Sequence, residues 1–249
     1  MPPPELIGLV NTGAKAEPGE FLRSGLADML NHMRALDAAG LSLEGCRAVL
    51  EFGCGAGRLL RHWLDADVEL SGCDFTPAVL DWCRAHLPGA RFERNAARPP
   101  LPYRDAEFDF VYANSVFTHI PLALQDAWLA ELRRVLRPGG VLLATVLGAH
   151  HRAALLDDAQ RAELEAAGSL ERGPVYAALD AQAAAGLLPR LARKARRTLH
   201  RAGLASAAPV YFAMVFQTPA RLEAALAPHF KLLRRHEVPD SQEILVLAT

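Results

Sequence analysis

The chain has 249 residues, with 27 basic and 28 acidic side chains and a formal net charge of −1 at pH 7. This length allows one large α/β domain, or one domain with an insert, and the near-neutral charge argues neither for nucleic acid binding nor against it. The longest apolar run, residues 141–149, is too short to cross a bilayer, and residues 1–4 lack the features of a secretory signal, so we expect a cytoplasmic protein without a transmembrane segment.

The cysteines show no pattern of a metal site or a disulfide framework. They form no C-x-x-C pair and have no histidine partner at metal-binding spacing. Two of them fall at predicted strand ends or turns, where a small apolar side chain packs well. We therefore expect four free thiols and no metal ion, the cysteines being Cys46, Cys54, Cys73 and Cys83.

Two different segments precede the first predicted strand. Residues 1–18 are rich in proline, glycine and small polar side chains, which is typical of a loose arm. Apolar side chains then recur at helical spacing from Phe21 to Leu36 and stop before Gly40. The pattern predicts one amphipathic helix.

Three alternate glycines follow the first apolar run. Residues 49–58 read V-L-E-F-G-C-G-A-G-R, and residues 58–64 continue at helical spacing, which indicates a strand, a tight turn and a helix. Glycines allow positive φ and a close approach of the backbone to a ligand, and the N–H groups that open the helix near Arg58 would face that ligand. The glycines are Gly53, Gly55 and Gly57.

A second apolar run ends in a carboxylate beside this turn. Residues 69–74 are predicted as a strand that ends at Asp74, and a carboxylate at such a strand end can accept both hydroxyl groups of a ribose. Thr76 and Pro77 are predicted to begin a helix that stops at residues 88–89. Residues 91–94 are strand-like, and three prolines make residues 95–103 a loop.

The next part of the chain continues the alternation of strands and helices. Residues 108–113 are predicted as a strand and residues 114–121 as the loop at its carboxyl end. Apolar side chains from Leu124 to Val135 predict a helix that ends at residues 138–140, and residues 141–147 a buried strand. Such alternation predicts a doubly wound parallel sheet with helices on both faces, whose ligands bind outside the carboxyl ends of the strands.

Together these motifs resemble the class I S-adenosylmethionine-dependent methyltransferases, in particular bacterial members. The resemblance rests on the glycine turn, on Gly72-Cys73-Asp74, on residues 108–112 and on residues 136–140, and it covers residues 45–148 well. It implies a mostly parallel seven-stranded sheet with one antiparallel edge strand. It also implies S-adenosylmethionine as cofactor and S-adenosylhomocysteine as product.

The resemblance also divides the chain into parts. Residues 1–40 are the arm and a helix that either covers the cofactor as a lid or only packs on the sheet. Residues 41–149 are the cofactor-binding Rossmann-like core, and residues 150–208 are a helical insert that could cover the acceptor. Residues 209–249 complete the sheet, with strand-like residues 210–217, a helix at 219–226, and a closing strand pair at 230–237 and 243–248.

Roles for the residues of the core follow from the same resemblance. Glu51 could face the cofactor's amino group or be a solvated strand-end charge, and Asp74 could bind the ribose or cap the next helix. Phe75 could lie against the adenine, while Asn95 and Ala96 stand where the family often has an acid. The candidate cofactor-binding residues are Glu51, Gly53, Cys54, Gly55, Gly57, Arg58, Asp74, Phe75, Asn95, Ala96, Asn114 and Ser115.

The acceptor is less closely defined. His119, in the loop after the fourth strand, is the candidate general base, or else a structural or capping histidine. Residues 114–117 lack the Asn/Asp-Pro-Pro-Tyr/Phe motif of enzymes that methylate base or glutamine nitrogens. We therefore expect transfer to an oxygen of a small-molecule or glycan-like acceptor. The candidate acceptor-binding residues are Phe117, Tyr176, Tyr211 and Gln217.

The insert carries an unusual charge bias. Residues 155–166, 176–186 and 189–201 are predicted as helices, and the last holds six cations and no acid. It could grip an anionic acceptor, touch a membrane surface or form a solvated amphipathic cover. No aromatic side chains interleave with its arginines, so a nucleic acid partner is not expected.

Two other functions compete with methyl transfer. An NAD-dependent oxidoreductase would need the spacing G-x-G-x-x-G, and Arg58 occupies the position of its third glycine. A catalytically silent module that binds S-adenosylmethionine, acting as a partner or regulatory subunit, would fit the missing acid after the third strand. The intact glycine turn and Asp74 count against that module.

Overall fold

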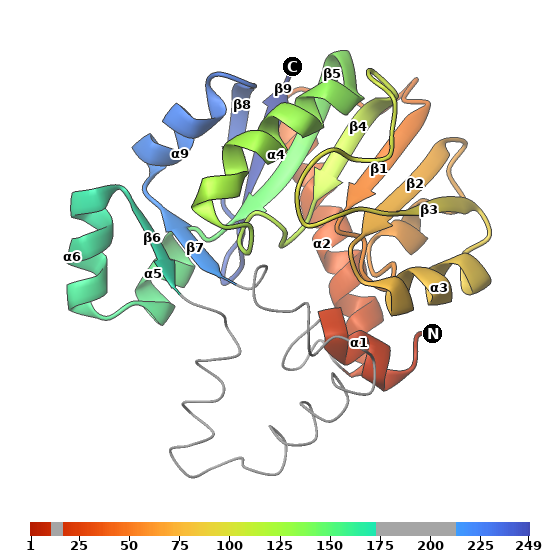
Figure 1. The fold of residues 1–249 in the computed structure, drawn as a ribbon, viewed down its shortest axis with the longest axis horizontal. Coiled ribbons are helices and arrows are strands. Elements are labelled where there is room, and N and C mark those ends of the chain that lie inside the picture. Colours follow the sequence, from red (N-terminus) through yellow and green to blue (C-terminus); the bar gives the residue numbers. More distant parts are fainter. Residues whose placement is uncertain (11–16, 173–212) are drawn as a thin grey trace.

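A seven-stranded sheet forms the centre of the protein in the computed structural model, which describes residues 1–10, 17–172 and 213–249. The strand order is β3-β2-β1-β4-β5-β9-β8, and strands β1 to β5 run parallel (Figure 1). This confirms the doubly wound fold. The strands are β1 (Ala48–Phe52), β2 (Glu69–Asp74), β3 (Ala90–Arg94), β4 (Phe108–Ala113), β5 (Leu136–Val146), β8 (Lys231–His236) and β9 (Glu243–Ala248).

The antiparallel strand is not at the edge, which corrects the expectation from the sequence. Strand β9 pairs antiparallel with both β5 and β8, so it lies inside the sheet and β8 forms the edge. The sequence E-I-L-V-L-A of β9 is almost entirely buried, whereas β8 carries Lys231, Arg234 and Arg235. Charged side chains protect an exposed edge from pairing with other chains, so this order suits both strands.

Helices cover both faces of the sheet. On one face, α4 (Leu122–Val135) and α9 (Pro219–Leu226) pack over a core that includes Trp128. On the other face, α2 (Pro18–Ala38) and α3 (Pro77–His86) pack over a second core. Figure 1 shows α4 in front of the sheet and α2 behind it. The predicted helices at 21–36, 124–135 and 219–226 are therefore confirmed.

Two predicted elements in the amino-terminal half differ from the structure. The loose arm contains a helix, α1 (Pro4–Val10), because Ile7 is fully buried against Phe21. The helix expected at 58–64 is only a 3₁₀ turn, η2 (Leu60–Trp63). The Arg61 guanidinium donates hydrogen bonds to the carbonyls of Ala56 and Gly57. The helical hydrogen bond from the backbone N–H of Arg61 to the carbonyl of Gly57 is long, at 3.4 Å between N and O. This competition prevents a regular helix from starting there.

Strand β5 begins earlier than the sequence predicts. Helix α4 ends at Val135, not at residues 138–140, and Leu136 already has extended backbone geometry and pairs with Phe108. A register shift between Phe108 and Phe110 accommodates the extra residues. Gly139, with φ of +79°, lies in this irregular part of β5, where we predicted the end of the helix.

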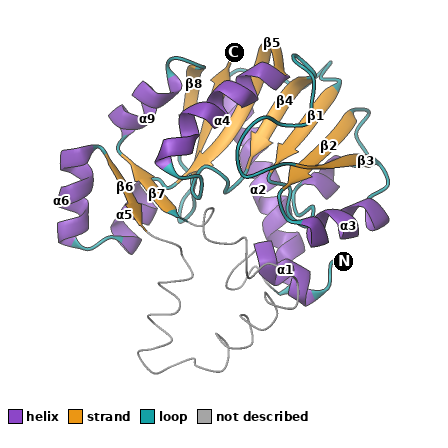
Figure 2. Cartoon of the chain, in the orientation of Figure 1, coloured by secondary structure: helices purple, strands orange, loops and turns teal. Residues whose placement is uncertain are grey.

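The insert is not entirely helical. The single helix expected at 155–166 is two, α5 (Ala149–Leu155) and α6 (Asp158–Ala167), because Asp157 forms a capping box with Gln160 that starts a new helix. Strand β6 (Ser169–Arg172) then pairs with β7 (Met214–Gln217) in a small antiparallel sheet beside the main one (Figure 2). The helices predicted at 176–186 and 189–201 lie outside the described residues.

Two further expectations can be compared with the structure. All four cysteines are free, and Cys54, Cys73 and Cys83 are buried. Among the described residues, no helix combines the length and the apolar character needed to cross a membrane.

The Asp109 carboxylate ties together the starts of three neighbouring strands. It accepts hydrogen bonds from the backbone N–H groups of Arg47 and Ala48, at 2.8 and 2.9 Å, and from the guanidinium of Arg137. Burial alone would raise the pKa of Asp109, but these hydrogen bonds outweigh burial and hold the pKa below its usual range. The ionised carboxylate therefore stabilises the fold.

We expect Asp109→Asn to lower the free energy of unfolding at pH 7 by about 1–3 kcal/mol, since one strong acceptor of three donors is lost. Because the folded-state pKa is depressed, the stabilisation is present above the ordinary pKa of 3.8 and is lost as the pH falls through the folded value. Urea denaturation of both proteins between pH 3 and pH 7 tests this. A difference that stays constant over this range would contradict it.

Candidate functional site

The glycine turn after β1 has no room for larger residues. Gly53, Gly55 and Gly57 have φ of +77°, +50° and +68°. A Cβ atom on Gly53 would lie 2.5 Å from Cγ2 of Val116, and one on Gly57 would lie 2.5 Å from Cδ1 of Leu87. The N–H groups of Gly53 and Cys54 both donate to the carbonyl of Cys73, at 2.9 Å, so the turn is fixed to the end of β2.

Asp74, at the end of β2, holds this turn through its side chain. Its Oδ2 accepts the N–H of Gly55 at 3.0 Å, and its Oδ1 accepts the N–H of Thr76 at 2.8 Å. Burial raises the pKa of Asp74, against the effect of these hydrogen bonds. Thr76 makes no capping hydrogen bond with its own side chain, and the N–H that Asp74 accepts belongs to Thr76, the residue that precedes α3 (Pro77–His86). A carboxylate offers about four lone pairs, which leaves capacity for further donors.

Glu51, at the end of β1, is buried beneath the turn. The hydroxyl group of Tyr112 donates to its Oε2 at 3.2 Å. Burial raises the pKa of Glu51 to about 8, although Arg58 and Tyr112 act in the opposite direction. Glu51 is therefore not a solvated strand-end charge, and at neutral pH most molecules carry it protonated.

The side chain of Arg58 lies against α2. Its Nη2 is 2.6 Å from Oδ2 of Asp28, and its Nη1 donates to the hydroxyl of Ser24 at 3.3 Å. Gly25 makes this approach possible, because a Cβ there would lie 2.5 Å from the carbonyl oxygen of Arg58. Arg58 thus joins the turn to α2, and only its backbone remains directed to the turn.

The loop after β3 is the third part of this region. The N–H of Asn95 donates to the carbonyl of Asp74, and its side-chain Nδ2 donates to the carbonyl of Ala96 at 2.9 Å. The Oδ1 atom of Asn95 is buried and has no hydrogen-bond partner in the described part of the chain. Phe75 is half-buried and Ala96 is exposed. An unpaired buried acceptor is costly, so a ligand donor at Oδ1 would stabilise this site.

Asn114 and Ser115, at the carboxyl end of β4, line a cavity of about 240 Å³. Ser115 has φ of +59°, which is unusual for a residue with a side chain. Its N–H donates to Oγ1 of Thr145 at 2.7 Å, and its hydroxyl lies 3.1 Å from Oε1 of Gln242. These hydrogen bonds hold the strained residue in place.

Of the residues that line this cavity, the sequence indicated only Asn114 and Ser115, and three of the others hold these two in place. His32 donates from Nε2 to Oδ1 of Asn114 at 3.1 Å, and burial lowers the pKa of His32 to about 4. Thr145 and Gln242 hold Ser115 as described. Only His32 left a signal in the sequence, since it is a polar residue within the apolar periodicity of α2. Thr145 and Gln242 meet only because β9 pairs with β5.

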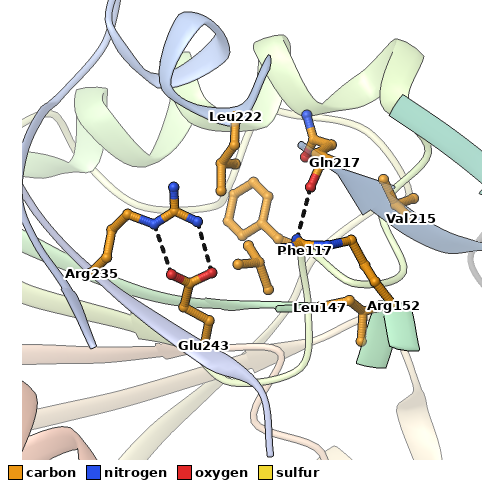
Figure 3. Close-up of a pocket in the computed structure, with 9 residues that line it drawn as sticks. Phe117, Leu147, Arg152, Val215, Gln217, Leu222, Arg235 and Glu243 are labelled. Atoms are coloured by element: carbon orange, nitrogen blue, oxygen red, sulfur yellow. Dashed lines mark hydrogen bonds and ion pairs between the residues drawn. The ribbon is translucent and has the colours of Figure 1, made fainter. Parts of the chain in front are cut away.

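Two of the residues proposed for the acceptor do not line this cavity. Phe117 and Gln217 line a much smaller one, about 10 Å³, shown in Figure 3. There the guanidinium of Arg235 forms a two-pronged ion pair with Glu243, and Arg152 donates to the carbonyl of Gln217 at 3.3 Å. About one water molecule fits such a space. Tyr176 and Tyr211 lie outside the described residues.

His119 is half-buried in the loop after β4, next to Ala213, the residue that precedes β7. Its Nδ1 lies 3.1 Å from the carbonyl oxygen of Ala213, so Nδ1 carries the proton and donates it. Burial lowers the pKa of His119, and this hydrogen bond only partly offsets the effect. His119 is not among the residues that line the cavity at Asn114.

Comparison with known proteins gives matches over the core. Residues 50–144 match the family model described as "Methyltransferase domain". Malonyl-(acyl-carrier protein) O-methyltransferase of Enterobacter lignolyticus is 37% identical over 118 residues, which are 47% of this chain and 46% of that protein. Trans-aconitate 2-methyltransferase of Methylobacterium radiotolerans is 36% identical over 106 residues, 42% of this chain and 39% of that protein. The aligned part thus spans less than half the length of these relatives.

The fold is also found among solved structures. An S-adenosylmethionine-dependent methyltransferase from Mesorhizobium loti superposes with a TM-score of 0.56 and covers 88% of this chain and 98% of its own. The sequence identity is 15%, so this similarity concerns the fold alone.

We expect Gly53→Ala to destabilise the protein more than Gly45→Ala does. Both glycines have φ near +80°, so each alanine costs about 1–2 kcal/mol in the left-handed region. At Gly45 nothing lies within 4 Å of the new Cβ, whereas at Gly53 the contact with Val116 adds about 1–3 kcal/mol of overpacking. Urea denaturation of the two variants measures the difference. Equal losses would contradict the close contact.

Proposed function

We propose that the chain, whose residues 50–144 match the model of a methyltransferase domain, is a class I S-adenosylmethionine-dependent enzyme. It transfers the methyl group to an oxygen of a small-molecule or glycan-like acceptor. The observation that carries the proposal is the Asp74 carboxylate, fixed against a glycine turn in which a Cβ on Gly53 or Gly57 would collide with a neighbour.

The residues at the carboxyl ends of β1, β2 and β3 fit this cofactor. Asp74 would accept the ribose hydroxyls with its remaining lone pairs, and Glu51 would face the amino group. Asn95 supplies a buried oxygen to which no group of the described residues donates, which suits the adenine amino group. The cofactor supplies an activated methyl group on a sulfonium ion, so the protein has to position the acceptor and exclude water.

A hydroxyl acceptor has to lose its proton when it takes the methyl group. We propose that a histidine accepts this proton, since both candidates are neutral at pH 7. In His119 the hydrogen bond to Ala213 makes Nε2 the basic nitrogen, and in His32 the hydrogen bond to Asn114 makes Nδ1 the basic nitrogen. Only His32 lines the cavity, which favours it over His119.

A catalytically silent module is the less favoured alternative. The relatives that match the same core are named as enzymes, and two are methyltransferases of quite different acceptors. The acceptors in these names are those of the relatives, so the acceptor proposed for this chain rests on its own residues.

We expect titration of the purified chain with S-adenosylhomocysteine to show saturable binding, and Asp74→Asn to raise Kd at least tenfold, about 1.4 kcal/mol. Asparagine replaces one acceptor oxygen with an amino group. The ribose then loses an acceptor, and the amino group faces the N–H of Gly55 or of Thr76, to which it cannot bond. Isothermal calorimetry measures Kd, and circular dichroism checks the fold.

Asp109→Asn is the matched control, since it makes the same change at the opposite end of the parallel strands and should leave Kd unchanged. A folded wild-type protein that does not bind S-adenosylhomocysteine would refute the cofactor. Equal Kd values for Asp74→Asn and the wild type would refute the role of Asp74.

We further expect binding of S-adenosylhomocysteine at pH 7 to release a proton from Glu51. The pKa of about 8 leaves this carboxyl mostly protonated before binding, and a cationic amino group beside it favours the ionised form. Affinity should therefore rise as the pH approaches 8. Calorimetry in two buffers of different ionisation enthalpy counts the protons, and Glu51→Gln should abolish their release. A wild type that releases none would contradict the assignment of Glu51.

A further inference from the structure

The cavity beside Asn114 lies where the carboxyl ends of β4 and β5 meet the loop that precedes β9. Its wall comes from α2, from the end of β4, from Thr145 on β5, from His151 on α5 and from residues 238–244. About 240 Å³ is enough for a ring-sized group but not for a large molecule. None of the residues proposed for the ribose or the glycine turn lines it, so it is separate from the part of the site centred on Asp74.

The described wall of this cavity contains no lysine or arginine. Of its two carboxylates, Asp28 is ion-paired with Arg58 at 2.6 Å, and Asp240 is highly exposed and lies 3.4 Å from His150. His32 is uncharged at neutral pH, because burial lowers its pKa to about 4. His151 also belongs to the wall. The described wall therefore offers an anion no lysine or arginine to pair with, and removing a carboxylate from water without such a partner is costly.

Of the three carboxamides in the wall, Asn114 and Gln242 have their oxygens occupied by other wall residues and their amino groups available. Oε1 of Gln242 accepts the hydroxyls of Ser115 and Thr145, at 3.1 and 2.5 Å. Oδ1 of Asn114 accepts Nε2–H of His32 at 3.1 Å. Within the described residues neither amino group donates a hydrogen bond, while both side chains line the cavity. The cavity thus presents fixed N–H donors without positive charge.

We propose that this cavity binds the methyl acceptor, and that the acceptor is an uncharged, hydroxyl-rich molecule whose oxygens accept hydrogen bonds from the amides of Gln242 and Asn114. This inference rests on the proposed function. It distinguishes the chain from the relatives named for malonyl and trans-aconitate, whose acceptors are carboxylates. Asn114, which the sequence placed with the cofactor, then lies on the border where acceptor and methyl group have to meet.

Two probes that differ in one group test the charge preference. Methyl β-glucopyranoside and methyl β-glucopyranosiduronate share a ring, but only the second carries a carboxylate. Binding of each to the full chain is measured by saturation-transfer NMR at pH 7, with and without saturating S-adenosylhomocysteine. We expect the neutral glycoside to bind at least tenfold more tightly than the anionic one.

A substitution in the wall tests the donor. Gln242→Glu keeps oxygens for the hydroxyls of Ser115 and Thr145 but removes the amino group, so it should weaken binding of the neutral glycoside at least tenfold without changing the Kd of S-adenosylhomocysteine. Gln160→Glu makes the same change in the capping box of α6, outside the cavity, and should alter neither affinity.

The outcomes separate this inference from the function on which it rests. Equal or tighter binding of the anionic glycoside, unchanged binding in Gln242→Glu, or no binding of either glycoside by the folded protein would each overturn the acceptor class. Loss of S-adenosylhomocysteine binding in the wild type would instead overturn the proposed function, and it is measured independently of the glycosides.

Discussion

The fold around the glycine turn depends on one buried carboxylate. Asp74 accepts an N–H from the turn and another from the start of α3, so a single side chain fixes two segments that leave neighbouring strands. Burial of a charge is unfavourable, and it raises the pKa of Asp74; backbone donors partly compensate. Asp74 can therefore stay buried only while the turn holds its backbone donors in place. The positive φ angles of the glycines allow this geometry.

Helix α2 supports the same turn from the other side. Met29 and Leu36 face the core between helix and sheet, whereas Asp28 and His32, on the same helix, reach Arg58 and Asn114. The structure thus shows α2 packed on the sheet, and its role as a lid over the cofactor stays a prediction. Its apolar positions stabilise the fold, and its two polar positions connect the fold to the cavity.

The local pattern of apolar and turn residues predicted the bounds of some helices and strands correctly but not those of others. Strands β2 and β4 and helix α9 have the predicted bounds, because apolar runs between turn residues define them without outside help. The regular helix predicted after the glycine turn does not form. The side chain of Arg61 donates to the carbonyls of Ala56 and Gly57, which a helix would use for backbone hydrogen bonds. The position of β9 and the pairing of β6 with β7 depend on contacts between distant segments, which periodicity does not contain.

The same distinction applies to the site. Glu51, Asp74 and the glycines lie within one strand-turn-strand unit, so their spacing in the sequence already brings them together. The cavity, in contrast, joins α2, β4, β5 and the loop before β9, and Gln242 reaches Ser115 across 127 positions of sequence. For this reason the cofactor could be inferred from motifs, whereas the acceptor candidates Phe117 and Gln217 lie in a space too small for a ligand.

Under the proposed function, the two halves of the site differ in charge for a physical reason. The cofactor is cationic at its sulfonium and amino groups, and the carboxyl groups of Glu51 and Asp74 lie on its side. On the acceptor side, the amides of Asn114 and Gln242 can orient oxygens without adding a charge. A cation there would repel the sulfonium at short range in a poorly hydrated site. Neutral donors avoid that repulsion, and they restrict the acceptor to molecules that do not need a counter-ion.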